Sequence, residues 1–263
     1  MLTEADCLPT GKDERAEIGE VIGAINKHLH TCEITQLEEG KASIDGLVFD
    51  TETLYCFQNN EHHEEGWLYN HIIGMLQHLD TFKNESYHDT KVGNMRNELE
   101  VAIFWSDLGK LSTMKDSPKK TWPDGTPQST AFGHAEASSR MFVEAFMQAN
   151  PSPDWIDIMK MQTIDFIVAE HMNAHKLAEM DEQGKTTIPE FLKAQVCLEE
   201  DLNALEPRLT DPWNWPKWEE LEIPHGANMG KKAYAWIRRG ASKLLRIKQK
   251  CDEYGRISKK SFN

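Results

Sequence analysis

Apolar residues recur at helical spacing along most of the chain, and this pattern restricts the fold to one built mainly from amphipathic helices. Between residues 68 and 79 the apolar side chains fall at Leu68, Ile72, Met75, Leu76 and Leu79, which share one face of a helix. The same spacing predicts further helices near residues 14–30, 99–108, 133–149, 155–175, 188–206 and 229–251. Residues 112–131 are rich in Ser, Thr, Pro and Lys and are expected to form a loop.

A different pattern near the N-terminus predicts a small β element. Apolar segments within residues 33–57 flank a turn at Glu39-Gly40-Lys41, as in a short hairpin. Gly and Pro punctuation suggests three parts. These are an N-terminal helix and hairpin (1–55), a helical body (56–208), and a Trp/Pro segment with a basic C-terminal helix (209–263). The expected fold class is therefore mainly α.

The distribution of charge limits the partners of the chain. Its 263 residues carry a formal net charge of -14, yet the stretch from Asp211 onward holds twelve Lys and Arg against six Asp and Glu. So acidic a body does not bind nucleic acid broadly through the phosphate backbone. We expect the basic tail to contact phosphates or an acidic partner, unless it is only a solvated helix face. A homo-oligomer is an open alternative.

Cysteine usage and hydropathy indicate a reduced cytoplasmic protein. The five cysteines at positions 7, 32, 56, 197 and 251 are scattered and form no C-x-x-C pair, which argues against a disulfide framework and a Cys-rich zinc site. No run approaches the roughly 20 apolar residues of a membrane span. The polar N-terminus lacks the apolar core of a secretory signal. No membrane partner is therefore expected.

Histidines and aspartates are spread over the predicted helices, about one to a helix. They are His71, Asp107, His134, His171 and Asp201, with His175 one turn after His171. Helices packed around a centre bring such residues together, as in the metal sites of helical bundles. Neutral imidazole and carboxylate are ligands that mid-row divalent cations accept. The pattern therefore favours a divalent metal site, although any one of these residues alone is more often a surface or satisfied buried side chain.

The order of these segments resembles the HD-domain metal-dependent phosphohydrolases, and most closely the HD domain of bacterial CCA-adding tRNA nucleotidyltransferases. The segments that carry the likeness are HHEEGWLYNHIIGML, SDLGK, FGHAE, FIVAEHMNAH and VCLEEDLNAL, within residues 55–205. The resemblance implies an HD-type helical bundle. No nucleotidyltransferase domain fits in the roughly 60 preceding residues, which also lack its signature, so CCA addition is not expected.

The resemblance also implies roles for individual residues. The metal ligands would be His71, Asp107, His134, His171 and Asp201. The catalytic residues would be Asp107, Lys110, His134 and His171, with His63, Glu65, Ser106 and His175 orienting them. The ion would be Mn²⁺, Mg²⁺, Co²⁺ or Ni²⁺. It would lower the pKa of bound water and neutralise phosphate oxygens, while Lys110 would contact phosphate as a point charge.

One departure from the family pattern leaves two functions open. The name-giving His-Asp pair is Ser106-Asp107 here, and a serine hydroxyl is a poor ligand at neutral pH. The leading expectation is a metal-dependent phosphohydrolase or phosphodiesterase acting on a nucleotide or an RNA-end phosphate. The alternative is a catalytically impaired HD-fold module that binds a nucleotide, RNA or a protein partner. A di-iron oxygenase, as in another branch of the superfamily, would need the missing histidine.

Overall fold

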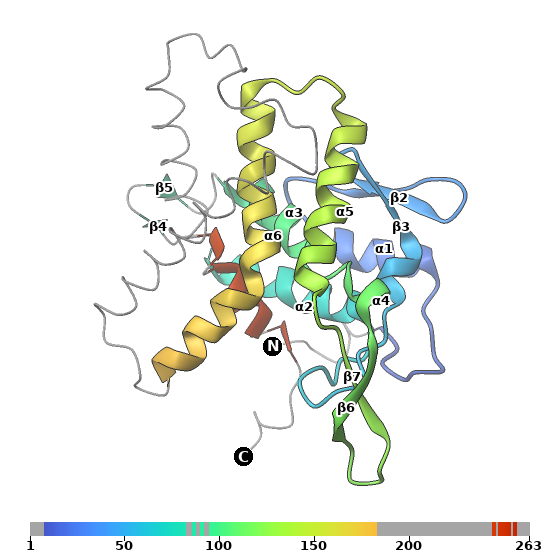
Figure 1. The fold of residues 1–263 in the computed structure, drawn as a ribbon. Coiled ribbons are helices and arrows are strands. Elements are labelled where there is room, and N and C mark those ends of the chain that lie inside the picture. Colours follow the sequence, from blue (N-terminus) through green and yellow to red (C-terminus); the bar gives the residue numbers. More distant parts are fainter. Residues whose placement is uncertain are drawn as a thin grey trace.

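A helical body carries three small antiparallel sheets (Figure 1). The structure is a computed structural model that describes residues 8–82, 86–87, 90–91, 95–182, 244–245, 247–253 and 255–256. The helices are α1 (Ile18–Asn26), α2 (Leu68–Leu79), α3 (Arg96–Trp105), α4 (Lys110–Thr113), α5 (His134–Ala149) and α6 (Trp155–Glu182), with 3₁₀ turns at Thr51–Tyr55 and Asp80–Phe82. Residues 244–256, as far as they are described, are largely helical and are called the C-terminal segment below.

The N-terminal sheet packs against α3 and holds its end in place. It has the order β1 (Ile34–Gln36), β2 (Lys41–Ile44) and β3 (Leu47–Asp50), all antiparallel. The inward residues of β2 and β3 are buried, as a period of two requires. Phe49 meets Phe104 and Trp105 at ring-centroid distances of 4.8 and 6.2 Å. This contact fixes the C-terminal end of α3, which Ser106 and Asp107 follow.

The expected fold, a mainly α helical bundle with one small β-hairpin, is wrong, because the described residues form three antiparallel sheets. The predicted turn at Glu39-Gly40 does join β1 and β2, but Asp45-Gly46 makes a second turn, and both of its residues have positive φ. Such a pair favours a tight hairpin, so a third strand forms. The supposed loop at 112–131 contains β6 (Lys115–Thr121) and β7 (Pro127–Thr130). Their polar sequence has little apolar periodicity from which a strand could be predicted.

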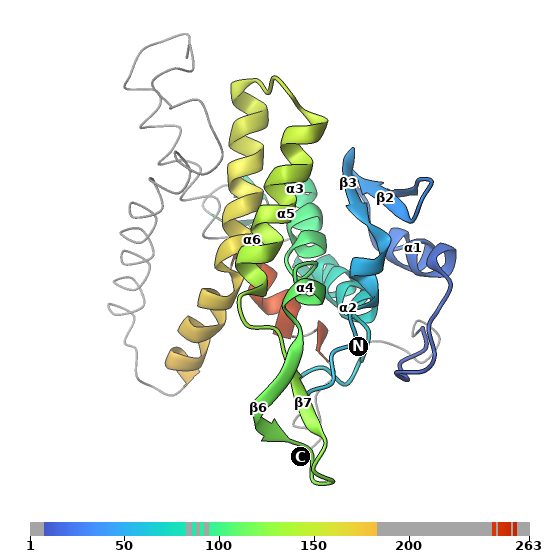
Figure 2. The same ribbon diagram turned by 45° about the vertical axis from the view of Figure 1, so that its right-hand side comes forward.

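Helices α5 and α6 form an antiparallel pair (Figures 1 and 2). His134 opens α5, whose last residue is Ala149, and His171 lies a similar distance into α6 from Trp155. At about 1.5 Å per residue, both histidines are about 23 Å from the short connection between the helices. Because the helices are antiparallel and the two distances are equal, His134 and His171 lie side by side, at the height of the first residue of α5.

Two close backbone approaches bring the remaining elements to this level. A Cβ built on Gly74 of α2 would lie 2.8 Å from the carbonyl oxygen of Gly255 in the C-terminal segment. A Cβ on Gly109 would lie 2.6 Å from the His134 carbonyl oxygen and from the Ser138 nitrogen of α5. The Gly109 amide also donates to Ser138 Oγ at 2.9 Å. Only glycine permits these contacts without displacing a neighbour.

One buried cluster joins apolar residues from α1, the N-terminal sheet, α2, α3, α5, α6 and the C-terminal segment. The β4–β5 pair (Ser86–Tyr87 and Thr90–Lys91) lies in the connection between α2 and α3. Within the described ranges, no helix combines the length and apolarity needed to cross a membrane. The predicted helices near 188–206 and, in large part, 229–251 lie outside the described residues.

We expect Gly74→Ala to destabilise the protein by about 1–3 kcal/mol, because the added methyl group would push the C-terminal segment away from α2. Gly23→Ala is the matched control, since Gly23 is also helical and a Cβ added there would meet nothing within 4 Å. That control should be neutral or slightly stabilising. Thermal unfolding of both variants tests this, and equal melting temperatures would show that the Gly74–Gly255 approach is not formed.

Asp165 of α6 gives a pH-dependent prediction for the α5–α6 pair. It is partly buried and accepts a hydrogen bond from Ser139 Oγ of α5 at 2.6 Å. Burial, with a smaller contribution from Glu170, raises the pKa of Asp165 to about 6. A raised carboxyl pKa means that the folded state binds the proton more tightly than the unfolded state, so stability falls as pH rises from about 4 to 6.

Asp165→Asn should therefore raise the unfolding free energy by about 1 kcal/mol above pH 6 and leave it unchanged below pH 4. Glu144→Gln removes the same charge at an exposed site on α5 and should show no such pH dependence. Denaturant unfolding across this pH range measures the difference. A loss of stability in Asp165→Asn at pH 7 would contradict the assignment of a destabilising carboxylate.

Candidate metal centre

Two groups of buried or nearly buried side chains could hold a metal ion in the described part of the chain. One consists of Asp107, His134 and His171, and the other of His63, Glu65 and His71. In each group the potential ligand atoms lie within 4.8 Å of one another. The two groups adjoin, because His71 Nε2 lies 3.5 Å from Asp107 Oδ2.

The imidazoles of His134 and His171 face each other in a way that favours binding of a cation. Their Nδ1 atoms lie 2.7 Å from the carbonyl oxygens of Ala131 and Val168, respectively. A carbonyl only accepts, so each Nδ1 carries the proton and each Nε2 presents a lone pair. These two Nε2 atoms are 3.0 Å apart, and lie 3.2 and 3.7 Å from Asp107 Oδ1. Two lone pairs and a carboxylate oxygen in one place form a ligand set suited to a divalent metal ion.

His71 adds a third imidazole, and the C-terminal segment adds a second carboxylate. His71 Nε2 lies 3.2 Å from Asp252 Oδ1, and both side chains are buried. Among the described residues, the buried atoms His71 Nδ1, His71 Nε2 and Asp107 Oδ2 have no hydrogen-bond partner of good geometry. Buried polar atoms are rarely left in this state. The Asp107–His134–His171 group therefore has two further potential donors nearby, His71 beside Asp107 and Asp252 beside His71.

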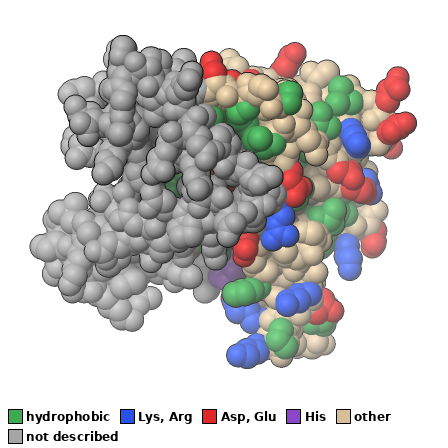
Figure 3. Space-filling model, turned by 45° about the horizontal axis from the view of Figure 1, so that its top comes forward, with side chains coloured by type: hydrophobic (Ala, Val, Ile, Leu, Met, Phe, Trp, Pro, Cys, Tyr) green, Lys and Arg blue, Asp and Glu red, His purple; other side chains and the backbone are tan. Residues whose placement is uncertain are grey.

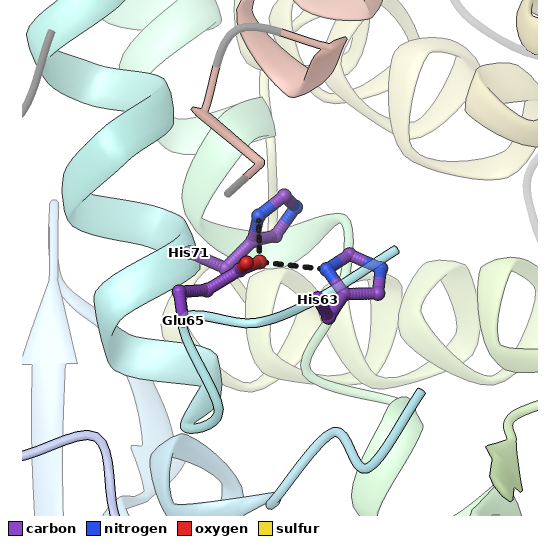
Figure 4. A group of neighbouring side chains, drawn as sticks. All are labelled: His63, Glu65 and His71. Carbon is purple, nitrogen blue, oxygen red and sulfur yellow. Dashed lines mark hydrogen bonds and ion pairs between the residues drawn. The ribbon is translucent and has the colours of Figure 1, made fainter. Parts of the chain in front are cut away.

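Glu65 orients His71 rather than forming a second site of equal quality. Its Oε1 lies 2.9 Å from His71 Nδ1 and 2.7 Å from His63 Nδ1 (Figure 4). A carboxylate on the outer nitrogen of an imidazole fixes its tautomer and turns the other nitrogen toward a metal. Figure 4 shows His71 between Glu65 and the C-terminal segment. Since His63 and His71 both direct Nδ1 at a single oxygen, an ion there would displace both contacts.

The protonation states of the side chains in the centre suit the binding of a metal ion, which would replace one proton. Burial alone would lower the pKa of His71, but the carboxylates of Asp107, Asp252 and Glu65 raise that pKa to about 10. Without an ion, His71 is therefore an imidazolium, and a metal would displace its proton. Burial opposes ionisation of Asp107, yet Lys110 and the imidazolium of His71 hold the pKa of this carboxyl well below its usual value. Burial and the nearby Lys248 lower the pKa of His171, which keeps it neutral.

Three cations surround the centre. Lys110 Nζ lies 3.2 Å from Asp107 Oδ1 and donates to Gln58 Oε1 at 2.6 Å. On the other side Lys248 Nζ and Arg256 Nε lie 3.1 and 2.9 Å from the Asp252 carboxylate. These cations balance the carboxylates of Glu65, Asp107 and Asp252, so a bound divalent ion would leave an excess of positive charge. Such a centre attracts an anion.

Most of the site residues that we selected from the sequence lie near one another in the structure, but not all of them do. The structure brings Asp107, His134 and His171 together as one group, with Lys110 beside Asp107. His71 adjoins this group through Asp107 and forms the second group with Glu65 and His63. Ser106 faces away, because its hydroxyl donates to the Ala102 carbonyl oxygen at 2.5 Å. Asp201 and the side chain of His175 lie outside the described residues.

Sequence reasoning missed Asp252. In the basic tail, Asp252 and Glu253 are the only acidic residues after Glu222, and that isolation was the available signal. Comparison with protein-family models, curated proteins and solved structures finds no match to this chain.

Asp252→Asn should weaken binding of Mn²⁺ or Co²⁺ by at least about tenfold, because it removes one charged donor. The adjacent exposed acid provides a matched control, Glu253→Gln, which should bind like the wild type. Asp201→Asn is the competing variant. Calorimetric titration of chelator-treated protein measures all three, and a loss confined to Asp201→Asn would refute the assignment of Asp252.

Proposed function

We propose that the chain is a divalent-metal-dependent phosphohydrolase or phosphodiesterase of the HD class, acting on a nucleotide or a nucleic-acid end. The observation that supports this most is the buried group of Asp107, His134 and His171, which His71 and Asp252 adjoin. Lys110 contacts Asp107, and Lys248 and Arg256 contact Asp252. A divalent ion in such a site supplies a nucleophile by lowering the pKa of bound water and neutralises phosphate oxygens. Mn²⁺, Co²⁺ and Ni²⁺ suit the imidazole-rich set better than Mg²⁺.

The chain's own side chains fill the supporting roles. Asp107 is ionised and lies beside all three imidazoles, so it anchors positive charge at the centre. Lys110 is almost fully buried and is held by Gln58. Its ammonium group can exchange the Asp107 contact for a phosphate oxygen at little cost in reorganisation. Glu65 and His63 act through His71 by fixing its ring.

The chemistry of the donors supports hydrolysis over the binding-module alternative. Ser106 contributes no donor, since its hydroxyl is used by the α3 backbone. Asp252 supplies a carboxylate beside His71, so five donors are available without the family's missing histidine. A module that had only retained an old pocket would have no need to keep buried carboxylates paired with buried lysines, which are costly to desolvate.

Hydrolysis of bis-p-nitrophenyl phosphate and p-nitrophenyl phosphate by Mn²⁺-loaded protein tests the proposal and separates diesterase from monoesterase. Asp107→Asn should reduce turnover to that of metal-free protein. Lys110→Met should retain the metal and lower kcat by about a hundredfold, because a preformed cation for the phosphate is lost. Glu253→Gln is the control expected to match the wild type.

Two results would refute the proposal that this chain is an enzyme. One is a metal-loaded wild type that hydrolyses neither ester nor any of a panel of nucleotides and RNA termini. The other is turnover that survives Asp107→Asn, which would place the activity elsewhere. Retention of metal without turnover would favour the binding module.

A further inference from the structure

The β6–β7 hairpin projects from the body beside the candidate centre. It is inserted between two residues of the site, because Lys110 in α4 precedes it and His134 at the start of α5 follows it. Lys115 and Thr130 pair at its base. Figures 1 and 2 show the hairpin extending away from the helices in both views. We call residues 115–130 the arm.

Asn59 fixes the arm relative to the centre. The Ser129 amide donates to the Asn59 carbonyl oxygen at 2.6 Å, and Trp122 Nε1 donates to Asn59 Oδ1 at 2.9 Å. The next residue back along the chain is Gln58, which holds Lys110. A ligand lying along the arm would therefore have a defined position relative to Lys110 and Asp107.

The arm presents lysines on a chain that is otherwise strongly acidic. Lys115, Lys119 and Lys120 are all exposed, as are Asp116 and Asp124, so three lysines against two aspartates give the arm a formal charge of +1. Lys120 Nζ lies 3.3 Å from Glu61 Oε1. In Figure 3 the lower end of the described surface carries several Lys or Arg side chains, together with hydrophobic side chains and some Asp or Glu. Since the net charge of the chain is -14, an exposed group of lysines next to the centre is a local attraction for an extended anion.

Exposed apolar side chains flank the centre on the same stretch of chain. Phe132 is 86% exposed, about twice the value of any other exposed large hydrophobic residue in the described part. It lies two residues before His134, so their Cα atoms are within about 7 Å. Leu111, 43% exposed, directly follows Lys110. An aromatic ring left in water this close to the centre offers a face on which a base can stack.

We propose that the arm and Phe132 bind single-stranded nucleic acid, with Lys115 and Lys119 on backbone phosphates and a base stacked on Phe132. A single strand exposes base faces, which an aromatic ring accepts whatever the sequence, and a duplex hides them. A mononucleotide would occupy the centre alone and leave the arm without a contact. For the reaction, this inference rests on the proposed function and names an oligonucleotide as its substrate. The binding part of the inference rests only on the arm and Phe132.

Fluorescence anisotropy with a fluorescein-labelled oligouridine of about ten nucleotides tests the binding in the presence of a chelator, so that hydrolysis does not interfere. Phe132→Ala should raise the Kd by about fivefold or more. The double variant Lys115→Ala/Lys119→Ala should raise the Kd and reduce the dependence of log Kd on log salt by about one to two. Val48→Ala and Lys41→Ala change exposed residues of the N-terminal sheet and should bind like the wild type.

Inorganic polyphosphate separates base stacking from general attraction of anions. As a competitor it should bind the wild type and Phe132→Ala equally, and bind the lysine variant more weakly. The inference is overturned if Phe132→Ala binds the oligonucleotide like the wild type, or if polyphosphate competes as well as unlabelled oligouridine.

Hydrolysis of bis-p-nitrophenyl phosphate, measured in parallel with Mn²⁺, reports on the centre independently. If the small diester is cleaved while the arm variants bind oligouridine normally, the inference fails and the proposed function stands. If the arm variants lose binding while no diester is cleaved, the proposed function fails and the nucleic-acid surface stands.

Discussion

The buried carboxylate of Asp107 is the interaction on which the rest of the site depends. It lies beside three imidazoles and one ammonium group, which come from α2, α4, α5 and α6. Burying a carboxylate is costly unless charge and hydrogen bonds compensate for it. Lys110 of α4 and the imidazolium of His71 of α2 compensate this charge, while the Nε2 lone pairs of His134 and His171 face Asp107 and leave a place for a cation. The charge of Asp107 couples the folding of the helical body to the assembly of the centre.

Backbone geometry makes that convergence possible. The equal lengths of chain on either side of the α5–α6 connection place His134 and His171 at one level. Gly109 lets the end of the Asp107 turn touch α5, and the Gly74–Gly255 approach lets the C-terminal segment place Asp252 over His71. Buried lysines then hold the carboxylates in position. If a divalent ion binds there, the same arrangement leaves positive charge available to an anion.

The parts of this structure that depend on local periodicity could be predicted from the sequence. The buried face of α2 follows from helical spacing. The histidines of α2, α5 and α6 were selected by their order along the chain, about one to a helix, and by the family resemblance. Asp252 was missed because its role depends on a tertiary contact far along the chain, within a tail whose composition suggested a basic surface. The strands of the arm were missed because polar strands without an apolar face have no period-two signal. Asp45-Gly46 is a readable turn signal, because Asp-Gly is a preferred pair in tight hairpins, and it was overlooked beside Glu39-Gly40.

The most direct test of the account is the anomalous scattering of crystals grown with Mn²⁺. The account predicts a peak about 2.0–2.3 Å from Nε2 atoms of the three imidazoles or from a carboxylate oxygen of Asp107 or Asp252, with Glu65 still on Nδ1 of His71. A peak between His63, Glu65 and His71 instead would contradict it. The account would also be contradicted if crystals grown in saturating Mn²⁺ showed no peak, with Lys110 still in contact with Asp107 and Lys248 still in contact with Asp252.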